Sequence, residues 1–357
     1  MKDLVFEKLS LGEIEKCYSA LGMEIGGKPH LFFGGEGVGF VCAYSGEKFD
    51  HCDIIWEGGG GTMSIVPMPG YEGWTLASRG FLSMVECAGS PIEIIRYQEG
   101  KFSHEPIAVV DYLHRFDTLL APDGTRYIIA ASLHGGKKNV DDWSTPGHLH
   151  VGVMPEDVTG SFTVELSQLP GDFYMNHGFC KAQWKGREAA FISSREGLFA
   201  VLPPEKPEGD WCAELLLPFP VSDIAIADVD GDGEMEIAAL LPFHGDQFKI
   251  FHKEKDACTY KEVYSHLSGN DFYHAIISGV IQGERLFAVG ARGGAGEVFL
   301  VRWDAKAKAY KSQLIEAGPG CSNLSLLNTK DGDLLLSANR TTDTAAVYRF
   351  DPKPAGK

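Results

Sequence analysis

Residues 276–317 read IISGVIQGERLFAVGARGGAGEVFLVRWDAKAKAYKSQLIEA, and they contain four short apolar runs separated by turn residues. Each run has the length of a β-strand and is bounded by glycine or charged residues, which is typical of antiparallel strands joined by tight turns. The second run, LFAVGAR, ends on Arg292 immediately before two glycines. This stretch therefore predicts one unit of four antiparallel strands, with a charged side chain at the end of its second strand.

The same unit recurs along the whole chain at intervals of roughly 40 to 60 residues, a period that indicates a repeat architecture. In each repeat an apolar run such as WTLASR or IIAASLH ends on a charged or imidazole side chain just before a turn. Four short antiparallel strands, repeated radially, form the blades of a β-propeller, in which equivalent strand ends share one face. The seven run-ending residues, which we expect to form a ring, are Glu36, Arg79, His134, Arg195, His244, Arg292 and Arg340.

The predicted fold class is all-β, a seven-bladed β-propeller in which the N-terminal strand closes the last blade. The seventh repeat ends after AVYRFDPK without a fourth strand, whereas the segment 3–11, DLVFEKLSL, precedes the first repeat. Because a propeller has to hide its sheet edges, we expect 3–11 to pair beside the strand that contains Tyr348. A single domain is predicted over 1–357, with blades at about 13–57, 58–111, 112–171, 172–219, 220–268, 269–317 and 318–351.

Composition limits the classes of partner. The formal net charge of −17 and the lack of a basic tract argue against nucleic-acid binding. No apolar run reaches the length of a membrane-spanning helix, and the N-terminus lacks the apolar core of a signal peptide. The eight cysteines form no CxxC pair. We therefore expect a reduced, cytoplasmic protein with no membrane contact, although removal of a leader would give the same pattern, and the oligomeric state stays open.

The segment IAIADVDGDGEMEIAAL in the fifth repeat carries alternating acidic residues around a glycine. Asp228, Asp230, Asp232 and Glu236 supply oxygen atoms with the spacing that suits a hard cation such as calcium. Because the loop joins two expected strands, it is not an EF-hand, and it resembles the FG-GAP or VCBS repeat signature of many β-propellers. We expect a structural calcium ion here, on the face opposite the ring. A hairpin turn without an ion is the alternative.

Alignment of the repeats on their first strands places three histidines in the same register. They are His114, His177 and His274, in the contexts YLHRF, MNHGF and FYHAI. Since this corner opens on the same face as the ring, the three imidazoles are expected to converge on one funnel. There they could bind a divalent metal ion (zinc, manganese or magnesium) with a position left for substrate. The alternative is that each histidine hydrogen-bonds a neighbouring strand at a buried corner.

Four arginines in the ring predict an anionic or oxygen-rich ligand. The third repeat carries the longest insertion between its second and third strands, HGGKKNVDDWSTPGHLHVG, and a long charged loop of this kind is often functional. Trp143 in this loop either stacks on a sugar ring or pins the loop. The residues expected to bind substrate are Arg79, Arg340, Lys138, Trp143, His148, His150, Tyr273 and Glu36.

Two classes of function fit these residues. The first is a lyase that removes a proton next to a carbonyl or carboxylate and expels a β-oxygen leaving group, which needs a base, a charge sink and an acid. The second is a propeller that binds an anionic or carbohydrate ligand, or a protein partner, without chemistry. The candidate catalytic residues are His114, His177, His274, His134, His244, Arg195 and Arg292.

A resemblance favours the lyase. The stretch KNVDDWSTPG at residues 138–147, the corner histidines and the acidic loop together resemble the propeller of aldos-2-ulose dehydratase-type enzymes. That resemblance implies elimination of water from a keto-sugar such as 1,5-anhydrofructose with a bound divalent metal ion. More loosely, the funnel resembles that of metal-dependent oligouronide lyases built on seven-bladed propellers.

Overall fold

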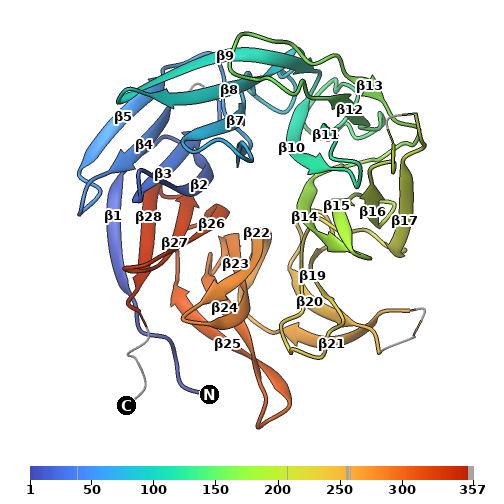
Figure 1. Ribbon diagram of the computed structural model, residues 1–357. Coiled ribbons are helices and arrows are strands. Elements are labelled where there is room, and N and C mark those ends of the chain that lie inside the picture. The colour runs from blue at the N-terminus through green and yellow to red at the C-terminus, as the bar shows by residue number, and fades with distance from the viewer. Residues whose placement is uncertain (38, 207, 255–256, 258, 353–357) are drawn as a thin grey trace. The chain divides into compact units, whose positions relative to one another are not determined.

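The structure is a computed structural model that describes residues 1–37, 39–206, 208–254, 257 and 259–352. Within the described residues the chain is all-β, and its strands form seven four-stranded sheets whose paired neighbours run antiparallel (Figure 1). This confirms the predicted seven-bladed β-propeller fold class. The described residues contain no helix long and apolar enough to span a membrane.

The chain divides into two compact units, and each is described by itself. One unit comprises Glu36–Gly39 and Glu57–Ile224, and it holds blades two, three and four. Blade two consists of β6 (Ile65–Pro67), β7 (Trp74–Ser78), β8 (Ser90–Gln98) and β9 (Lys101–Val110). Blade three consists of β10 (Leu113–Leu120), β11 (Arg126–Ser132), β12 (Leu149–Val153) and β13 (Ser167–Gln168). Blade four consists of β14 (Gly178–Trp184), β15 (Arg187–Ser193), β16 (Leu198–Leu202) and β17 (Cys212–Leu217).

The other unit comprises Met1–Gly35, Phe40–Trp56 and Ala225–Lys357. Blade one consists of β2 (Cys17–Ile25), β3 (Lys28–Gly35), β4 (Val41–Ser45) and β5 (His51–Trp56). Blade five consists of β18 (Asp223–Ala227), β19 (Glu236–Leu241), β20 (Gln247–His252) and β21 (Lys261–His266). Blade six consists of β22 (Asn270–Ile281), β23 (Glu284–Gly294), β24 (Val298–Asp304) and β25 (Ala309–Glu316). Blade seven consists of β26 (Cys321–Thr329), β27 (Gly332–Asn339), β28 (Thr344–Phe350) and β1 (Glu7–Glu13).

The apolar runs are continuous, without alternating polar residues, because the inner strands of a blade are covered on both faces. In blade five every residue of β19 is buried, whereas most residues of β21, the outermost strand, are exposed or half-buried. Leu240 and Phe248 of blade five pack in one cluster with Phe287 and Phe299 of blade six. Burial on both faces removes the alternation of apolar and polar residues that a half-exposed strand would show.

The N-terminal strand closes the last blade, as the sequence predicts. Strand β1 pairs with β28, and Lys8 lies opposite Tyr348 (Figure 1). The predicted bounds of 3–11 are wrong by a few residues, since β1 begins at Glu7. The preceding residues follow a different strand: the Leu4 N–H donates to Gln313 Oε1 of β25 at 2.8 Å, and Gln313 Nε2 donates to the Leu4 carbonyl at 2.7 Å.

A β-bulge recurs at the start of the first strand in most blades. The pairing of the first and second strands shifts register on either side of Tyr18, His114, His274 and Ser322, so each of these is the extra residue of a β-bulge. A bulge re-aims the side chain that it carries. Two residues earlier the backbone takes a positive φ, which requires the left-handed region. These residues are Lys16 (48°), Tyr112 (57°), Phe272 (50°) and Gly320 (66°). Gly59 (79°) and Met175 (53°) likewise lie two positions before the corner residues Gly61 and His177.

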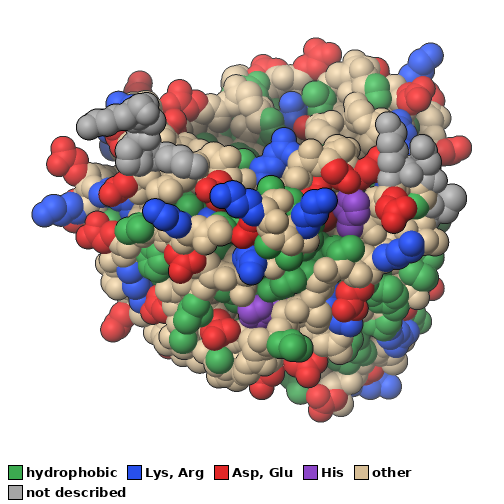
Figure 2. All heavy atoms as spheres, turned by 90° about the horizontal axis from the view of Figure 1, so that it is seen from below, with side chains coloured by type: hydrophobic (Ala, Val, Ile, Leu, Met, Phe, Trp, Pro, Cys, Tyr) green, Lys and Arg blue, Asp and Glu red, His purple; other side chains and the backbone are tan. Residues whose placement is uncertain are grey.

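On the face of the molecule that Figure 2 shows, Lys and Arg side chains lie among Asp and Glu side chains.

The double hydrogen bond of Gln313 gives the first test. We expect Gln313→Ala to lower the free energy of unfolding by about 1 to 3 kcal/mol, because the substitution leaves both polar groups of Leu4 without a partner and the side chain is 7% exposed. Urea unfolding of the purified chain measures the change. Lys311→Ala, on the same strand but exposed, is the control that should leave the midpoint unchanged. Equal midpoints for the two variants would contradict this role of the N-terminal segment.

Candidate functional site

The corner histidines are buried, and each hydrogen-bonds the corner of the next blade. His114 Nδ1 lies 3.2 Å from the carbonyl oxygen of His177. His177 Nδ1 lies 3.2 Å from the carbonyl oxygen of Ser222. His274 Nδ1 lies 2.7 Å from the carbonyl oxygen of Ser322. The three side chains are 1–2% exposed.

This hydrogen bond fixes the tautomer of each ring. A carbonyl oxygen only accepts, so the Nδ1 atom of His114, His177 and His274 has to donate. A neutral imidazole that carries its proton on Nδ1 has its lone pair on Nε2. Histidines that ligate a metal ion commonly have this arrangement, with the second nitrogen donating to a backbone carbonyl. The corner hydrogen bond that the sequence suggested as a purely structural alternative is therefore present, and it also prepares Nε2 to act as a ligand.

Within the unit of blades two to four, the structure brings His114 and His177 together. Their ring centroids are 4.5 Å apart and the ring planes meet at 38°. Two imidazoles so arranged are compatible with a divalent ion that favours nitrogen ligands. His274 belongs to the other unit, so the prediction that it shares one ion with this pair stays a prediction.

His274 has its own neighbours within the unit of blades one, five, six and seven. The Tyr18 hydroxyl lies 3.3 Å from His274 Nε2, and Tyr18 is 3% exposed. The His244 ring stacks on the His274 ring with centroids 5.3 Å apart. His244 has a φ of 48°, which lies in the left-handed region. Residues other than glycine seldom adopt this region. Sequence analysis did not select Tyr18, although the stretch KCYSALG places it at the corner of blade one.

Two of the ring arginines lie over aromatic side chains. The guanidinium carbon of Arg195 is 4.0 Å from the centroid of Tyr174. That of Arg292 is 4.4 Å from the centroid of Phe272, the residue with positive φ two positions before His274. A cation held over a ring keeps its charge while its orientation is restricted. These contacts position both arginines beside the corners of their own blades.

Arg79 is held differently. Its Nη2 donates to the Gly58 carbonyl at 3.3 Å, and its Nη1 lies 3.6 Å from Glu93 Oε1. The buried Glu93 carboxylate also accepts a contact from His104 Nδ1 at 3.1 Å. The two remaining ring residues, Glu36 and Arg340, are half-buried.

The long loop of blade three is bonded to itself and to the segment of blade two that contains Met84. His134 Nε2 donates to the Met84 carbonyl at 2.8 Å, and its Nδ1 accepts from the Gly136 N–H at 3.0 Å. Burial lowers the pKa of His134 to about 4, so this ring is neutral near pH 7. The Lys137 ammonium lies 3.1 Å from the centroid of Trp143. These contacts favour the reading in which Trp143 pins the loop.

The other expected substrate-binding residues are scattered. The Lys138 N–H donates to Asp142 Oδ2, and the Lys138 side chain is exposed. His148 Nδ1 lies 3.1 Å from the Gly171 carbonyl oxygen, and burial lowers the pKa of His150. Tyr273 is fully buried, and its hydroxyl contacts Ser268 and Asn270. Tyr273 therefore lies in the interior of blade six, whereas Tyr18, at the corner of blade one, contacts His274.

A buried ion pair follows the corner positions, and sequence analysis missed it. Arg115, one residue after His114, donates from Nη1 to the Met63 carbonyl at 2.9 Å, and its Nη2 lies 4.0 Å from Asp223 Oδ2. Burial raises the pKa of Asp223 to about 7, although the charge of Arg115 opposes that rise. The sequence does place a charged residue directly after the corner in two blades, Arg115 after His114 and Asp223 after Ser222. That pattern could have indicated the ion pair.

The acidic loop joins β18 to β19, as expected, and two sets of ligand atoms gather there. Oxygen atoms of Asp228, Asp230 and Asp232 lie within 4.8 Å of one another, and so do atoms of Asp230, Glu236 and His252. Oxygen donors of this kind fit a hard cation. Glu236 is already hydrogen-bonded, since its carboxylate accepts from the Val229 N–H at 2.7 Å and the Tyr310 hydroxyl at 2.6 Å.

Asp228 of the loop has a cationic partner. Asp228 Oδ2 lies 2.8 Å from Arg285 Nη1. That ion pair and the hydrogen bonds to Glu236 contribute to holding the hairpin. The structural calcium ion stays a prediction, and His252 is a ligand candidate that the sequence pattern did not include.

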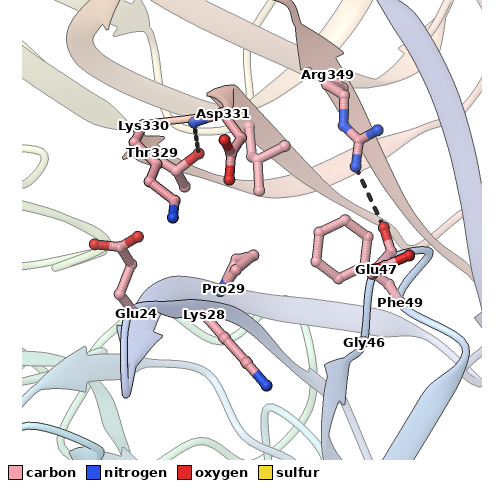
Figure 3. Close-up of a pocket in the computed structure, with 12 residues that line it drawn as sticks. Glu24, Lys28, Pro29, Gly46, Glu47, Phe49, Thr329, Lys330, Asp331 and Arg349 are labelled. Carbon is pink, nitrogen blue, oxygen red and sulfur yellow. Dashed lines mark hydrogen bonds between the residues drawn. The ribbon is translucent and has the colours of Figure 1, made fainter.

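Two pockets of about 420 Å³ each lie at turns that join first and second strands. Figure 3 shows the one in the unit of blades one, five, six and seven, whose lining includes Glu24, Lys28, Pro29, Phe49 and Lys330. The second is lined by residues such as Tyr71, Arg126 and Met154. Neither pocket is lined by a residue that the sequence analysis selected for the site.

Comparisons with known proteins bear on the fold alone. No protein-family model matches the chain, and no curated protein matches it. Among solved structures it is similar to the crystal structure of the extracellular domain of a candidate one-component system from B. thetaiotaomicron, with a TM-score of 0.56 and 10% sequence identity. The match covers 96% of this chain and 39% of that chain. At this identity the likeness supports the fold and carries no statement about activity.

The acidic loop gives the second test. We expect calcium at about a hundred times its dissociation constant to add about 2.7 kcal/mol to the stability of the parent chain, and chelation to remove it. In Asp230→Asn this gain should vanish, because Asp230 belongs to both sets of ligand atoms. Asp123→Asn, in the equivalent turn of blade three, is the control and should respond to calcium as the parent does. Thermal unfolding curves of the parent that coincide with calcium and with chelator would rule the ion out.

Proposed function

We propose that the protein is a metal-dependent carbon–oxygen lyase that acts by β-elimination on a keto-sugar or uronide-type carbohydrate. The observation that carries this proposal is the donation of Nδ1 to a backbone carbonyl by three corner histidines in equivalent positions. In its neutral form such a ring offers Nε2, as a metal ligand must. The sequence resemblance at residues 138–147 supports the same class of reaction.

His114 and His177 would hold the metal ion in this proposal. When bound, a divalent ion polarises a carbonyl or carboxylate oxygen and so makes the neighbouring C–H bond more acidic. The burial of both rings favours this use, since a neutral imidazole is the form that burial stabilises.

Within the unit of blades one, five, six and seven, Tyr18 and His274 form a pair that can move a proton. A hydroxyl 3.3 Å from an imidazole nitrogen can exchange a proton with it, so one group can accept the substrate proton while the other returns one to the leaving oxygen. Arg195 and Arg292 are restricted by their aromatic partners, and each offers, beside the corner of its own blade, the positive charge that an enolate needs.

His177→Asn tests the proposal more sharply than an alanine variant. The asparagine Nδ2 atom takes the place of Nδ1 and can still donate to the Ser222 carbonyl, whereas no atom replaces Nε2. We expect this variant to unfold at the parent's temperature, to lose its share of bound divalent metal, and to eliminate at least about a hundredfold more slowly. His51→Ala, exposed on β5, is the control for both readouts.

The assay uses ultraviolet absorbance of the unsaturated product from 1,5-anhydrofructose and from an oligouronide, with metal content measured before and after chelation. Product formation that is indifferent to chelation would contradict the metal. Saturable binding of either carbohydrate with no absorbance change would replace the lyase by the non-catalytic binding function.

A further inference from the structure

The pocket of about 420 Å³ in Figure 3 is lined by residues of blades one and seven, which belong to the same unit. Its lining does not include the corner histidines or the other residues of the proposed site. Sites for small molecules in proteins have volumes of about 300 to 1,000 Å³ and combine an apolar surface with a few polar groups that fix the orientation of the ligand. This pocket has the volume of a site for a small ligand.

The buried part of the lining is apolar. Phe49 and Leu334 are each 3% exposed, and both belong to one core cluster. Phe49 has a φ of 56°, in the left-handed region, where a bulky residue is a rare outlier. Its N–H donates to the Gly46 carbonyl at 3.2 Å, so the turn and the core together impose this conformation. The side chain of Phe49 is therefore a fixed apolar surface.

Charged side chains of both signs complete the lining. Three are acidic and three are basic: Glu24, Glu47, Asp331, Lys28, Lys330 and Arg349. Within the described residues, none of these six forms an ion pair with an N···O distance of 4.0 Å or less. Because they do not neutralise one another in ion pairs, both signs of charge are available to a ligand.

Arg349 supplies a positive charge beside the apolar surface. Figure 3 shows its guanidinium on the side of the pocket where Phe49 and Glu47 lie. One nitrogen, Nη2, donates to the Glu47 carbonyl at 3.5 Å. A guanidinium has five N–H donors, so this bond restricts the side chain and leaves donors for a carboxylate, which the planar group binds through two parallel hydrogen bonds.

The opposite side of the pocket carries a net negative charge. Figure 3 shows Glu24 and Lys330 on the side away from Arg349. Asp331 follows Lys330 in the turn between β26 and β27, and the Asp331 N–H donates to Thr329 Oγ1 at 3.2 Å, which restricts the turn. Two carboxylates and one ammonium group leave an excess of one negative charge, so this side favours a cationic group of a ligand.

We propose that this pocket is a binding site for a small zwitterion with an apolar body, of the class of α-amino acids with a large apolar side chain. Arg349 binds the carboxylate of the ligand, Glu24 and Asp331 accept hydrogen bonds from its ammonium group, and its side chain lies against Phe49. Binding here is separate from the proposed lyase reaction, which uses none of these residues.

The second pocket provides a matched control. It also has a volume of about 420 Å³ and also lies at turns that join first and second strands, but in the other unit. Arg126 is the basic residue of its lining. Both Arg126 and Arg349 are half-buried, so the same substitution at each position makes a comparable change in a different pocket.

The experiment titrates the full chain by calorimetry with L-phenylalanine, with phenylacetate, which lacks the ammonium group, and with phenethylamine, which lacks the carboxylate. We expect L-phenylalanine to bind at least about tenfold more tightly than either analogue. Each analogue leaves one side of the pocket without its partner, and a hydrogen bond to a charged group contributes about tenfold or more to affinity.

Variants assign each charge to its side of the pocket. In Arg349→Met, L-phenylalanine should bind no more tightly than phenethylamine, because the carboxylate has lost its partner. In Glu24→Gln the preference for L-phenylalanine over phenylacetate should shrink, whereas Arg126→Met should keep the affinities of the parent. Thermal unfolding curves that coincide with that of the parent show that each variant is folded.

Three results would overturn the proposal. The first is an affinity for L-phenylalanine no higher than that for either analogue, which includes the case in which it does not bind. The second is a preference for L-phenylalanine over phenethylamine that survives in Arg349→Met together with an unchanged preference in Glu24→Gln. The third is a loss of affinity in Arg126→Met that Arg349→Met does not show, which would place the ligand in the second pocket.

Discussion

The β-bulge at the start of the first strand is the constraint on which the candidate site depends. A left-handed residue two positions earlier turns the chain, and the bulged residue is then aimed away from the regular pleat. In blades three and six that residue is a histidine whose Nδ1 reaches the backbone of the next blade. One backbone device thus orients the ring, selects its tautomer and ties neighbouring blades together.

The same hydrogen bond serves stability and chemistry, so the two interpretations of the corner histidines are not exclusive. A buried imidazole without a partner would cost free energy, and the carbonyl removes that cost. The tautomer that results leaves Nε2 as the basic atom, which at His274 contacts Tyr18. Blades that hold serine at the corner, such as Ser222 and Ser322, supply carbonyl acceptors and no imidazole.

The repeat pattern was enough to predict the blades and the closing strand, because apolar runs covered on both faces and Gly-rich turns are local features of the sequence. The register of His114, His177 and His274 was also visible. Tyr18 was missed because its repeat fits the pattern least well, and the pair of Arg115 and Asp223 was missed because it depends on contacts between distant segments. The contacts of the blade-three loop, such as Lys137 over Trp143, likewise arise only after folding.

The central claim is that the corner histidines are neutral and protonated on Nδ1. Long-range ¹H–¹⁵N correlation spectra of the chain labelled in histidine measure this directly, with His114→Asn, His177→Asn and His274→Asn used for assignment. The account predicts that all three rings carry the proton on Nδ1 near pH 7 and that the Nε2 resonances of His114 and His177 shift when zinc is added. Rings protonated on Nε2, or charged rings, would contradict it.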